Sequence, residues 1–581
     1  MPSLFCGASS SFPEVEMAAR LTTFVVVAIV AATLIAGLIV GAQRDDSDGP
    51  VDLIVHNARV YTATAKGTMA EAVAIRGNQI LRVGSDREIA RLKRPQTTML
   101  DAKGAAVLPG FNDAHLDLVQ GGAALDRIDL LDTASIEDAE LKVRDWAEAN
   151  PDRPWILGRG WTRRAFGGAL PNRQMLDRIV PDRPAQLLSA DGRYAWVNTR
   201  ALERARIKRR TADPAHGLIL RDARSGEATG VLEGAAIGLV DAVVPKATIS
   251  EHERALRAAI SELHRFGVTS VQDVGGSLSE LAAYAEARRA GDLRLRIYSA
   301  VPVTGDLPDA ELDRLESETR KYADDPLLKA GATSVDLGDS PEAVSGDTEK
   351  APKTSMRFDP DTLNRLIRRL DARGWQILTE APGAAAVGRA LDAYAHAVRS
   401  NPTRAAERRH RIEGMQAVAD GDLGRFDALR VLASLRPFED PGLHAGPAIA
   451  APAAETGAPG ALARHVSSAR GRLAFGSGWP AAPVNPLLGI GDMVKPSSDP
   501  GDEDGARLSL KAAIDAYTSA GAWASFDEQR KGTIAPGMLA DLVILSGDIF
   551  KSAAADVAGA RVETTIFDGK VVYRRGQRDS N

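Results

Sequence analysis

Cysteine is almost absent from this sequence. Cys6 is the only one among 581 residues, which excludes an intramolecular disulfide and any metal cluster made of several cysteines. A strong excess of charge of one sign is also missing, because 72 lysines and arginines face 77 aspartates and glutamates. The basic residues form no stripe, and neither an RNA-binding signature nor a zinc-finger spacing occurs. We therefore expect no nucleic acid partner.

Charge is missing altogether from one stretch near the start of the chain. Residues 21–42, LTTFVVVAIVAATLIAGLIVGA, contain no charged side chain. At a rise of 1.5 Å per residue, about 20 such residues cross the roughly 30 Å hydrocarbon core of a bilayer. The sequence thus predicts a transmembrane helix over 21–42, preceded by a tail (1–20) and followed by a linker (43–50). We expect this segment to anchor the protein in a membrane by a single pass.

The ends of the apolar segment leave alternatives open. Val40-Gly41-Ala42 fits a small-residue cleavage site, so the alternative is a cleaved signal peptide and a secreted protein. Against it, the run exceeds the roughly 7 to 15 apolar residues of a usual signal peptide. Arg20 and Arg44 give almost no difference in flanking positive charge. The expected orientation, with the bulk of the chain outside the cytoplasm, follows from the short N-terminal tail. Met17 is an alternative start.

Short alternating and β-branched runs occupy both ends of the remaining chain. Residues 51–108 contain DLIVHNARVYTA and EAVAIRGNQILRVGS, and residues 528–581 contain ADLVILSGDIF and RVETTIFDGKVVYRRG. Gly and Asn punctuate these runs, which is typical of antiparallel strands. We expect the two ends of the chain to build one β-sandwich together.

The middle of the chain, residues 109–527, alternates amphipathic helices with short apolar runs. ERALRAAISELHRFG precedes VTSVQDV, and DTLNRLIRRLDARG precedes WQILTEA. Strands that alternate with helices of about 10 to 15 residues predict a parallel sheet, and the number of repeats fits a (β/α)8 TIM barrel. The expected fold class is α/β. Three polar segments, DSPEAVSGDTEKAPKTS, GPAIAAPAAETGAPG and PSSDPGDEDGA, are predicted to be loops.

Ordered sequence segments connect this chain to a known family. They include VLPGFNDAHLDL, DGRYAWVNTRAL, RHRIEGMQ, LAFGSGWPAAPVNPLLGI and KGTIAPGMLADLVIL. In content and order they resemble amidohydrolase family 3, the branch that includes the N-substituted formamide deformylases, over roughly residues 51–575. The resemblance implies a TIM barrel with a metal site at the C-terminal ends of its strands. It also implies metal-dependent hydrolysis of non-peptide C–N bonds, such as those of amides and formamides.

The resemblance implies a particular set of metal ligands. These are a His-x-His pair on the first strand, a carboxylated lysine, two further histidines and an aspartate on the last strand. Such residues hold one or two divalent cations, which lower the pKa of a bound water toward neutrality. The resulting hydroxide attacks the carbonyl while the aspartate moves protons. Alternate strand residues face the same side, so both imidazoles of the pair enter the barrel mouth.

Most of these positions differ in this chain. His115 remains, but Asp117 stands where the second histidine belongs. The other departures are Ser334 for the lysine, Glu380 and Gly414 for two histidines, Gly478 for the aspartate, and Arg193 and Gln272 for two more histidines. Lys329, five residues before Ser334, has no matching context. Since zinc sites use three or four protein ligands, we expect no tightly bound metal at the inherited site and no cofactor.

Five residues are candidates for a changed site. His115 and Asp117 are the candidate ligands if zinc or another divalent metal binds in a rewired arrangement. Asp117 and Glu380 are candidates for a pair of carboxylates that performs general acid/base catalysis without metal. Arg193 and Arg436 would favour a carboxylate or phosphate if they point into the mouth. The alternative for these arginines is a place on the surface or a partnership with Glu380.

The sequence therefore favours a membrane-anchored pseudoenzyme. It would have an amidohydrolase-like barrel with a degenerate metal site, and its role would be to bind an unidentified small molecule or protein. The alternative is an active hydrolase whose metal site is rewired around His115 and Asp117. A third hypothesis is a metal-free enzyme that uses Asp117 and Glu380.

Overall fold

The structure is a computed structural model that describes residues 50–190, 192–214, 217–338, 356–403, 407–437, 459–495 and 508–577. The predicted transmembrane segment 21–42 lies outside these residues. Within the described ranges, no helix is both long enough and apolar enough to cross a bilayer. The membrane anchor therefore remains a prediction from the sequence.

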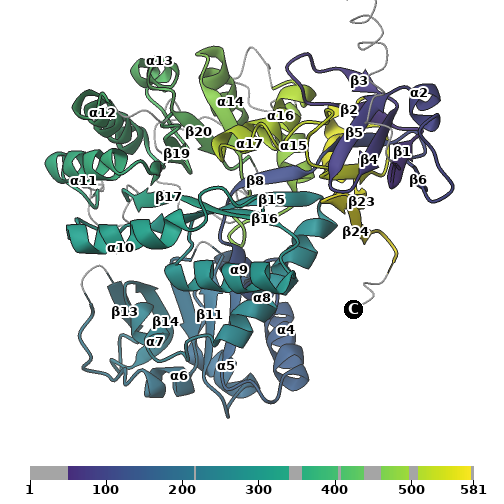
Figure 1. Cartoon of the computed structure of the whole chain (residues 1–581). Helices are drawn as coiled ribbons and strands as arrows, with labels where there is room; N and C mark the ends of the chain where they lie inside the picture. Colours follow the sequence, from purple (N-terminus) through teal and green to yellow (C-terminus); the bar gives the residue numbers. More distant parts are fainter. Residues whose placement is uncertain are drawn as a thin grey trace, which may run out of the picture.

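Eight parallel strands form the central barrel (Figure 1). In sheet order they are β8 (Phe111–Leu116), β15 (Val268–Asp273), β16 (Arg296–Pro302), β17 (Leu328–Asp336), β18 (Gln376–Glu380), β19 (Arg411–Glu413), β20 (Leu432–Leu435) and β21 (Arg472–Phe475). Neighbours in this series pair in parallel register. The predicted α/β barrel is confirmed, because each strand is joined to the next by a crossover.

The barrel nearly closes where β21 returns to β8. Gly478 N donates to His115 O over 2.7 Å, and Asp117 N donates to Trp479 O over 2.8 Å. A Cβ atom at Gly476 would lie 2.4 Å from His115 N. Glycine is therefore required at position 476 for the first and last strands to approach this closely. The contact holds the two ends of the strand series together beside the candidate site.

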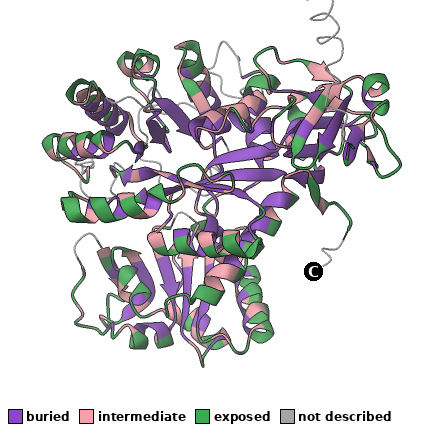
Figure 2. Cartoon of the chain, in the orientation of Figure 1, coloured by how far each residue is buried: buried purple, intermediate pink, exposed green. Residues whose placement is uncertain are grey.

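Helices cover the outside of the barrel, with buried inner faces and exposed outer faces (Figure 2). They are α8 (Ile249–Arg265), α9 (Leu278–Ala290), α10 (Asp309–Arg320), α11 (Pro360–Ala372), α12 (Ala384–Ser400), α13 (Asp420–Leu429), α14 (Pro459–Ser468), α15 (Pro486–Val494), α16 (Leu510–Ala516) and α17 (Ser519–Ala524). Several of them, including α8, α9 and α11, begin at residues whose side chains cap the helix. For example, Thr248 and Glu251 form a capping box at the start of α8. The same helix buries Leu256, Ile260 and Leu263.

A second α/β unit is inserted between β8 and β15, and we call residues 125–248 the insert. Its six-stranded sheet contains β13 (Gly217–Arg221), β14 (Ala228–Gly234), β12 (Tyr194–Val197), β11 (Ala185–Ser189), β10 (Ile156–Trp161) and β9 (Ile128–Asp129) in that order. Its helices are α4 (Ile136–Ala149), η2 (Arg163–Phe166), α5 (Arg173–Ile179), α6 (Thr199–Arg204) and α7 (Gly238–Asp241). The preceding α3 (Leu118–Ala124) links it to β8. The domain boundaries expected from the sequence place this unit within the barrel, at residues 109–527.

The two ends of the described chain meet in a pair of sheets at one side of the barrel (Figure 1). One sheet contains β5 (Gln79–Gly84), β4 (Ala72–Arg76), β1 (Leu53–His56) and β6 (Thr98–Asp101), with α2 (Asp86–Ala90) beside it. The other contains β24 (Lys570–Arg574), β23 (Val562–Phe567), β22 (Leu542–Leu545), β7 (Ala106–Pro109), β2 (Arg59–Tyr61) and β3 (Met69–Ala70). Between β22 and β23 lies η3 (Ala554–Gly559). Val55, Ile75 and Leu542 belong to one apolar core shared by both sheets.

Buried charges join the barrel to this sandwich. Arg296, at the start of β16, donates to Asp541 over 2.6 Å and to Asp568 over 2.8 Å. Both aspartates belong to the C-terminal part of the sandwich, and Arg296 is 3% exposed. The ion pairs therefore fix the sandwich against the end of the barrel that lies opposite the candidate site.

Candidate functional site

The C-terminal ends of the barrel strands bring the predicted site residues together. His115 lies near the end of β8, Asp117 follows this strand, Glu380 ends β18, and Gly414 follows β19. Gly478 follows β21 and contacts Arg436, which follows β20. Because parallel strands of a barrel all end at one face, residues far apart in the sequence share this mouth.

His115 is held by a buried carboxylate. Its Nδ1 lies 2.8 Å from Oε2 of Glu413, on β19, and the two side chains are 12% and 2% exposed. Metal-binding histidines usually make such a contact with their second nitrogen, so His115 keeps the surroundings of a ligand. Sequence reasoning did not single out Glu413, although it lies in the quoted RHRIEGMQ segment.

Glu413 is in turn paired with Arg411 inside the barrel. Arg411 Nη2 lies 2.5 Å from Glu413 Oε1 and donates to Ala114 O over 2.6 Å. Arg411 also donates to Gln272, and its side chain is fully buried. Burial alone would raise the pKa of Glu413, but the charges of Arg411 and His115 lower it to about 2. Gln272, at a position where the family has histidine, therefore belongs to the barrel interior.

Asp117 lies at the N-terminus of α3 without capping it. Within the described part of the chain its carboxylate takes part in no hydrogen bond or ion pair. Burial raises the pKa of Asp117, while His115 and Arg436 oppose the shift and Glu380 adds to it. The charges of His115, Arg436 and Glu380 thus all act on the carboxyl of Asp117.

Glu380 and Arg436 form an ion pair across the mouth. A Cβ atom at Gly414 would lie 2.0 Å from Glu380 Oε1 and 2.6 Å from Arg436 Nη2. A Cβ atom at Gly478 would lie 2.9 Å from Arg436 Cδ. The pair therefore occupies space next to two positions where the family carries a histidine and an aspartate. This ion pair with Glu380 is one of the alternatives that the sequence left open for Arg436.

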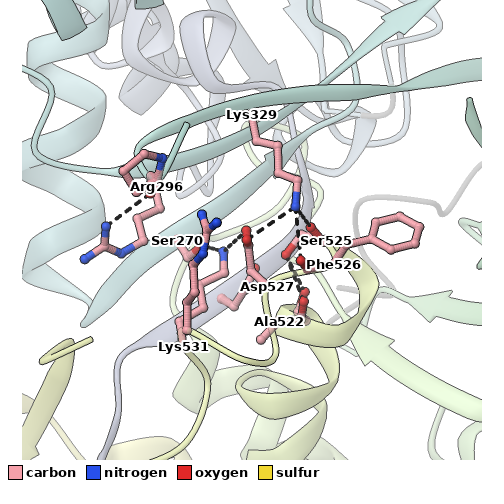
Figure 3. A network of polar contacts seen from close by, with 12 residues as sticks. Ser270, Arg296, Lys329, Ala522, Ser525, Phe526, Asp527 and Lys531 are labelled. Carbon is pink, nitrogen blue, oxygen red and sulfur yellow. Dashed lines mark hydrogen bonds and ion pairs between the residues drawn. The ribbon is translucent and has the colours of Figure 1, made fainter. Parts of the chain in front are cut away.

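The position at which the family has its lysine also holds no metal ligand, because Ser334 stands there and its side chain is engaged by the backbone. Ser334 Oγ, on β17, donates to Val274 O over 2.9 Å. Lys329 lies near the opposite end of the same strand, where its Nζ donates to Ser525 O and Phe526 O over 2.9 and 3.1 Å (Figure 3). Lys531 belongs to the same network, and burial lowers its pKa to about 8. Lys329 is thus far from the mouth and does not replace the missing lysine.

Three further polar residues near the family motifs stabilise the barrel. Asp273 accepts from Leu118 N and from Tyr284 Oη over 3.2 and 2.8 Å. Burial, with the charges of Glu280 and Asp117, raises the pKa of Asp273 to about 7. Asp113 accepts from the backbone of His115 and Ser477, and burial raises its pKa to about 6. His410 Nδ1 accepts from Ile377 N over 3.1 Å, which is a structural role.

Arg193 lies in the insert, before β12, and its Nη2 is 3.8 Å from Glu233 Oε1. It also lies over the ring of Tyr194. It is not among the residues that line the cleft at the barrel mouth, whereas Arg436 is. Of the two predicted anion-binding arginines, the structure thus brings only Arg436 to the other candidates.

A cleft of about 640 Å³ separates the mouth from the insert. Asp117, Arg436 and Gly478 line it from the barrel, and Arg127 and Arg159 line it from the insert. Sequence reasoning missed these two arginines. For Arg159 the signal was the strand-like run ILGRGW in a region assigned to the barrel, and no motif marked Arg127.

The residues present at the mouth do not fit a divalent cation. His115 and Asp117 remain as donors, but the guanidinium of Arg436 lies against two inherited ligand positions. A cation there would have to displace Arg436 from the carboxylate of Glu380, with which it is paired. Throughout the described ranges, no three His, Cys, Asp or Glu side chains gather closely enough to hold a metal ion.

Comparison with known proteins assigns the chain to a family. The family model described as "Amidohydrolase family" matches residues 98–573. The chain belongs to the amidohydrolase family. It is 30% identical to protein LONG AFTER FAR-RED 3 of Arabidopsis thaliana over 544 residues, which cover 90% of this chain and 91% of the relative. The predicted membership is therefore confirmed.

Two other similar proteins carry functional descriptions. The N-substituted formamide deformylase of Arthrobacter pascens is 26% identical over 551 residues, which cover 90% of this chain and 98% of the relative. The crystal structure of an uncharacterized metal-dependent hydrolase from Pyrococcus horikoshii OT3 has a TM-score of 0.65 at 21% identity and covers 87% of this chain and 98% of that one. The second likeness supports the amidohydrolase-like fold.

Proposed function

We propose that this amidohydrolase-family protein is a pseudoenzyme, which binds a ligand at the barrel mouth instead of hydrolysing it with a metal. One observation carries the proposal. The Arg436–Glu380 ion pair lies against Gly414 and Gly478, so the space beside two inherited ligand positions holds a guanidinium. Loss of the aspartate at position 478 also removes the family's proton-transfer group.

A metal analysis of the full-length protein in detergent tests this proposal. After incubation with zinc or manganese and desalting, we expect far less than one metal ion per chain by mass spectrometry. We also expect no turnover of a panel of N-formyl and N-acyl amides, with or without added metal. His115→Ala should change neither result. Near-stoichiometric metal together with turnover, both lost in His115→Ala, would overturn the proposal.

The second candidate function is a hydrolase with a rewired metal site. The retained His115–Glu413 contact and the unpaired carboxylate of Asp117 favour it. The same assay separates the two, because a rewired site requires metal-dependent turnover that is lost in both His115→Ala and Asp117→Ala. The metal-free use of Asp117 and Glu380 is disfavoured, since Glu380 is already engaged by Arg436.

We also propose that residues 21–42 anchor the protein in a membrane, with the bulk of the chain outside the cytoplasm. The support is the uncharged 21–42 segment of the sequence. We expect the full-length protein to remain in the membrane pellet after an alkaline carbonate wash, and to be released when 21–42 is deleted. Extraction of the intact chain by the wash, or cleavage after Ala42, would contradict a permanent anchor.

A further inference from the structure

The insert presents two unpaired guanidinium groups to the cleft. Arg127 precedes β9, Arg159 lies on β10, and these two strands pair in parallel. Within the described part of the chain, neither guanidinium donates a hydrogen bond or closes an ion pair. Loss of hydration lowers the pKa of both groups, although the charges of Asp126 and Asp241 oppose the shift at Arg127 and that of Asp129 opposes it at Arg159. An unpaired and partly dehydrated arginine is stabilised when an anion supplies its hydrogen bonds.

A second cavity of about 490 Å³ adjoins the cleft; apolar atoms make up most of its surface, and charged residues such as Arg153, Lys246 and Glu251 also line it. The two cavities share Ala123, Arg127, Ala247 and His252, so Arg127 lies at their junction. Trp146 and Trp155 line the second cavity, together with Leu125, which is 48% exposed. Flat aromatic side chains and an exposed leucine beside a cationic junction suit a ligand with an apolar body and an anionic head.

The charges on the opposite wall determine how such a ligand would lie. Asp117 and Glu280 line the barrel side of the cleft. These carboxylates repel an anionic head, whereas Arg127 and Arg159 attract it to the insert side. Arg436 adds little attraction, because Glu380 already neutralises it. The head therefore belongs near Arg127 and Arg159, from where the body reaches the tryptophans.

We propose that the cleft binds a small organic carboxylate with an aromatic or other apolar body, through Arg127 and Arg159. The inference rests on the proposed function, because a mouth without a catalytic metal leaves the arginines of the insert to select the ligand. A planar guanidinium matches a carboxylate through two parallel hydrogen bonds. Arginine binds phosphate in the same way, so the test includes both head groups.

Isothermal titration of the full-length protein in detergent provides the test, with 4-phenylbutyrate as the probe. We expect measurable binding that weakens about tenfold or more in Arg127→Gln and in Arg159→Gln, because each loses a charged hydrogen bond. The neutral amide, 4-phenylbutyramide, should bind correspondingly more weakly. Trp146→Ala should weaken binding of 4-phenylbutyrate. The control Arg314→Gln removes an exposed arginine that pairs with Glu311 on α10, and it should change nothing.

Five binding results would contradict the inference or the proposed function. Equal binding of acid and amide, or unchanged binding in the Arg127→Gln, Arg159→Gln double variant, would overturn the inference. Tighter binding of phenyl phosphate than of 4-phenylbutyrate would overturn the carboxylate assignment. Absence of binding to metal-poor protein would overturn the inference and leave the proposed function standing. Binding that EDTA abolishes and Arg127→Gln leaves intact would place the carboxylate on a metal and overturn both.

Discussion

Replacing Arg411 by methionine is expected to lower the free energy of unfolding by about 4 kcal/mol, because it leaves the buried charge of Glu413 without its arginine partner and with His115 as its remaining charged contact. Arg411 is fully buried and contacts Glu413, Gln272 and Ala114. The measurement is a urea unfolding curve at pH 7. The control is Arg289→Met on α9, which removes an arginine that is 70% exposed. That change should alter stability by less than about 1 kcal/mol.

The double variant Arg411→Met, Glu413→Gln separates lost charge pairing from lost packing. Removing the carboxylate together with the guanidinium avoids an uncompensated buried charge, so part of the stability should return. A double variant no more stable than Arg411→Met would contradict the charge argument. In that case the loss would come from the volume and hydrogen bonds of Arg411 alone.

The dependence of stability on pH gives an independent check on Glu413. Its folded pKa is lowered to about 2 from an ordinary 4.5. A depressed carboxylate pKa stabilises the fold above the unfolded value, and this stabilisation disappears as the pH falls from 4.5 toward 2. Glu413→Gln should therefore lose less stability than the parent over that interval. Parallel curves for the two proteins would contradict the assigned shift.

The sequence predicted those parts of the fold and of the site that depend on local patterns of apolar and polar residues. Helical segments such as ERALRAAISELHRFG and the apolar runs after them predicted the barrel repeat, and α8 followed by β15 matches that expectation. His115 and Asp117 were placed at a strand end by their position after VLPGFNDA. Since barrel strands end at one face, their meeting with Glu380 and Arg436 followed from the fold class.

The features that sequence missed depend on contacts between distant segments. Glu413 reaches His115 only because β19 and β8 face each other across the barrel, 298 residues apart. Arg127 and Arg159 became visible as a pair only when β9 and β10 formed the sheet of the insert. The insert itself was hidden, because its strands and helices alternate as those of the barrel do. Arg193 was a candidate for the mouth through the resemblance of DGRYAWVNTRAL to the family, but it lies in the insert and does not line the cleft.

Rebuilding the inherited ligands is expected to turn a chain that retains little zinc into one that binds about one ion. The variant combines Asp117→His, Gly478→Asp and Arg436→Ala, which with His115 supplies two histidines and one aspartate, and removes the guanidinium. Gly478 has a φ of +70°, a conformation that aspartate tolerates better than most residues. Zinc retained after desalting is measured by mass spectrometry, and circular dichroism verifies the fold.

Two matched variants isolate the reason for the gain. Arg436→Ala alone removes the positive charge without adding a donor, so it should stay poor in zinc. His115→Ala in the rebuilt variant leaves two ligands and should lose the ion, because zinc sites need three or more. The rebuilt protein should also unfold at a higher temperature when zinc is present, since a ligand that binds only the folded state stabilises it. A parent chain that retains as much zinc as the rebuilt one, or a folded rebuilt chain that takes up none, would contradict this account of the site.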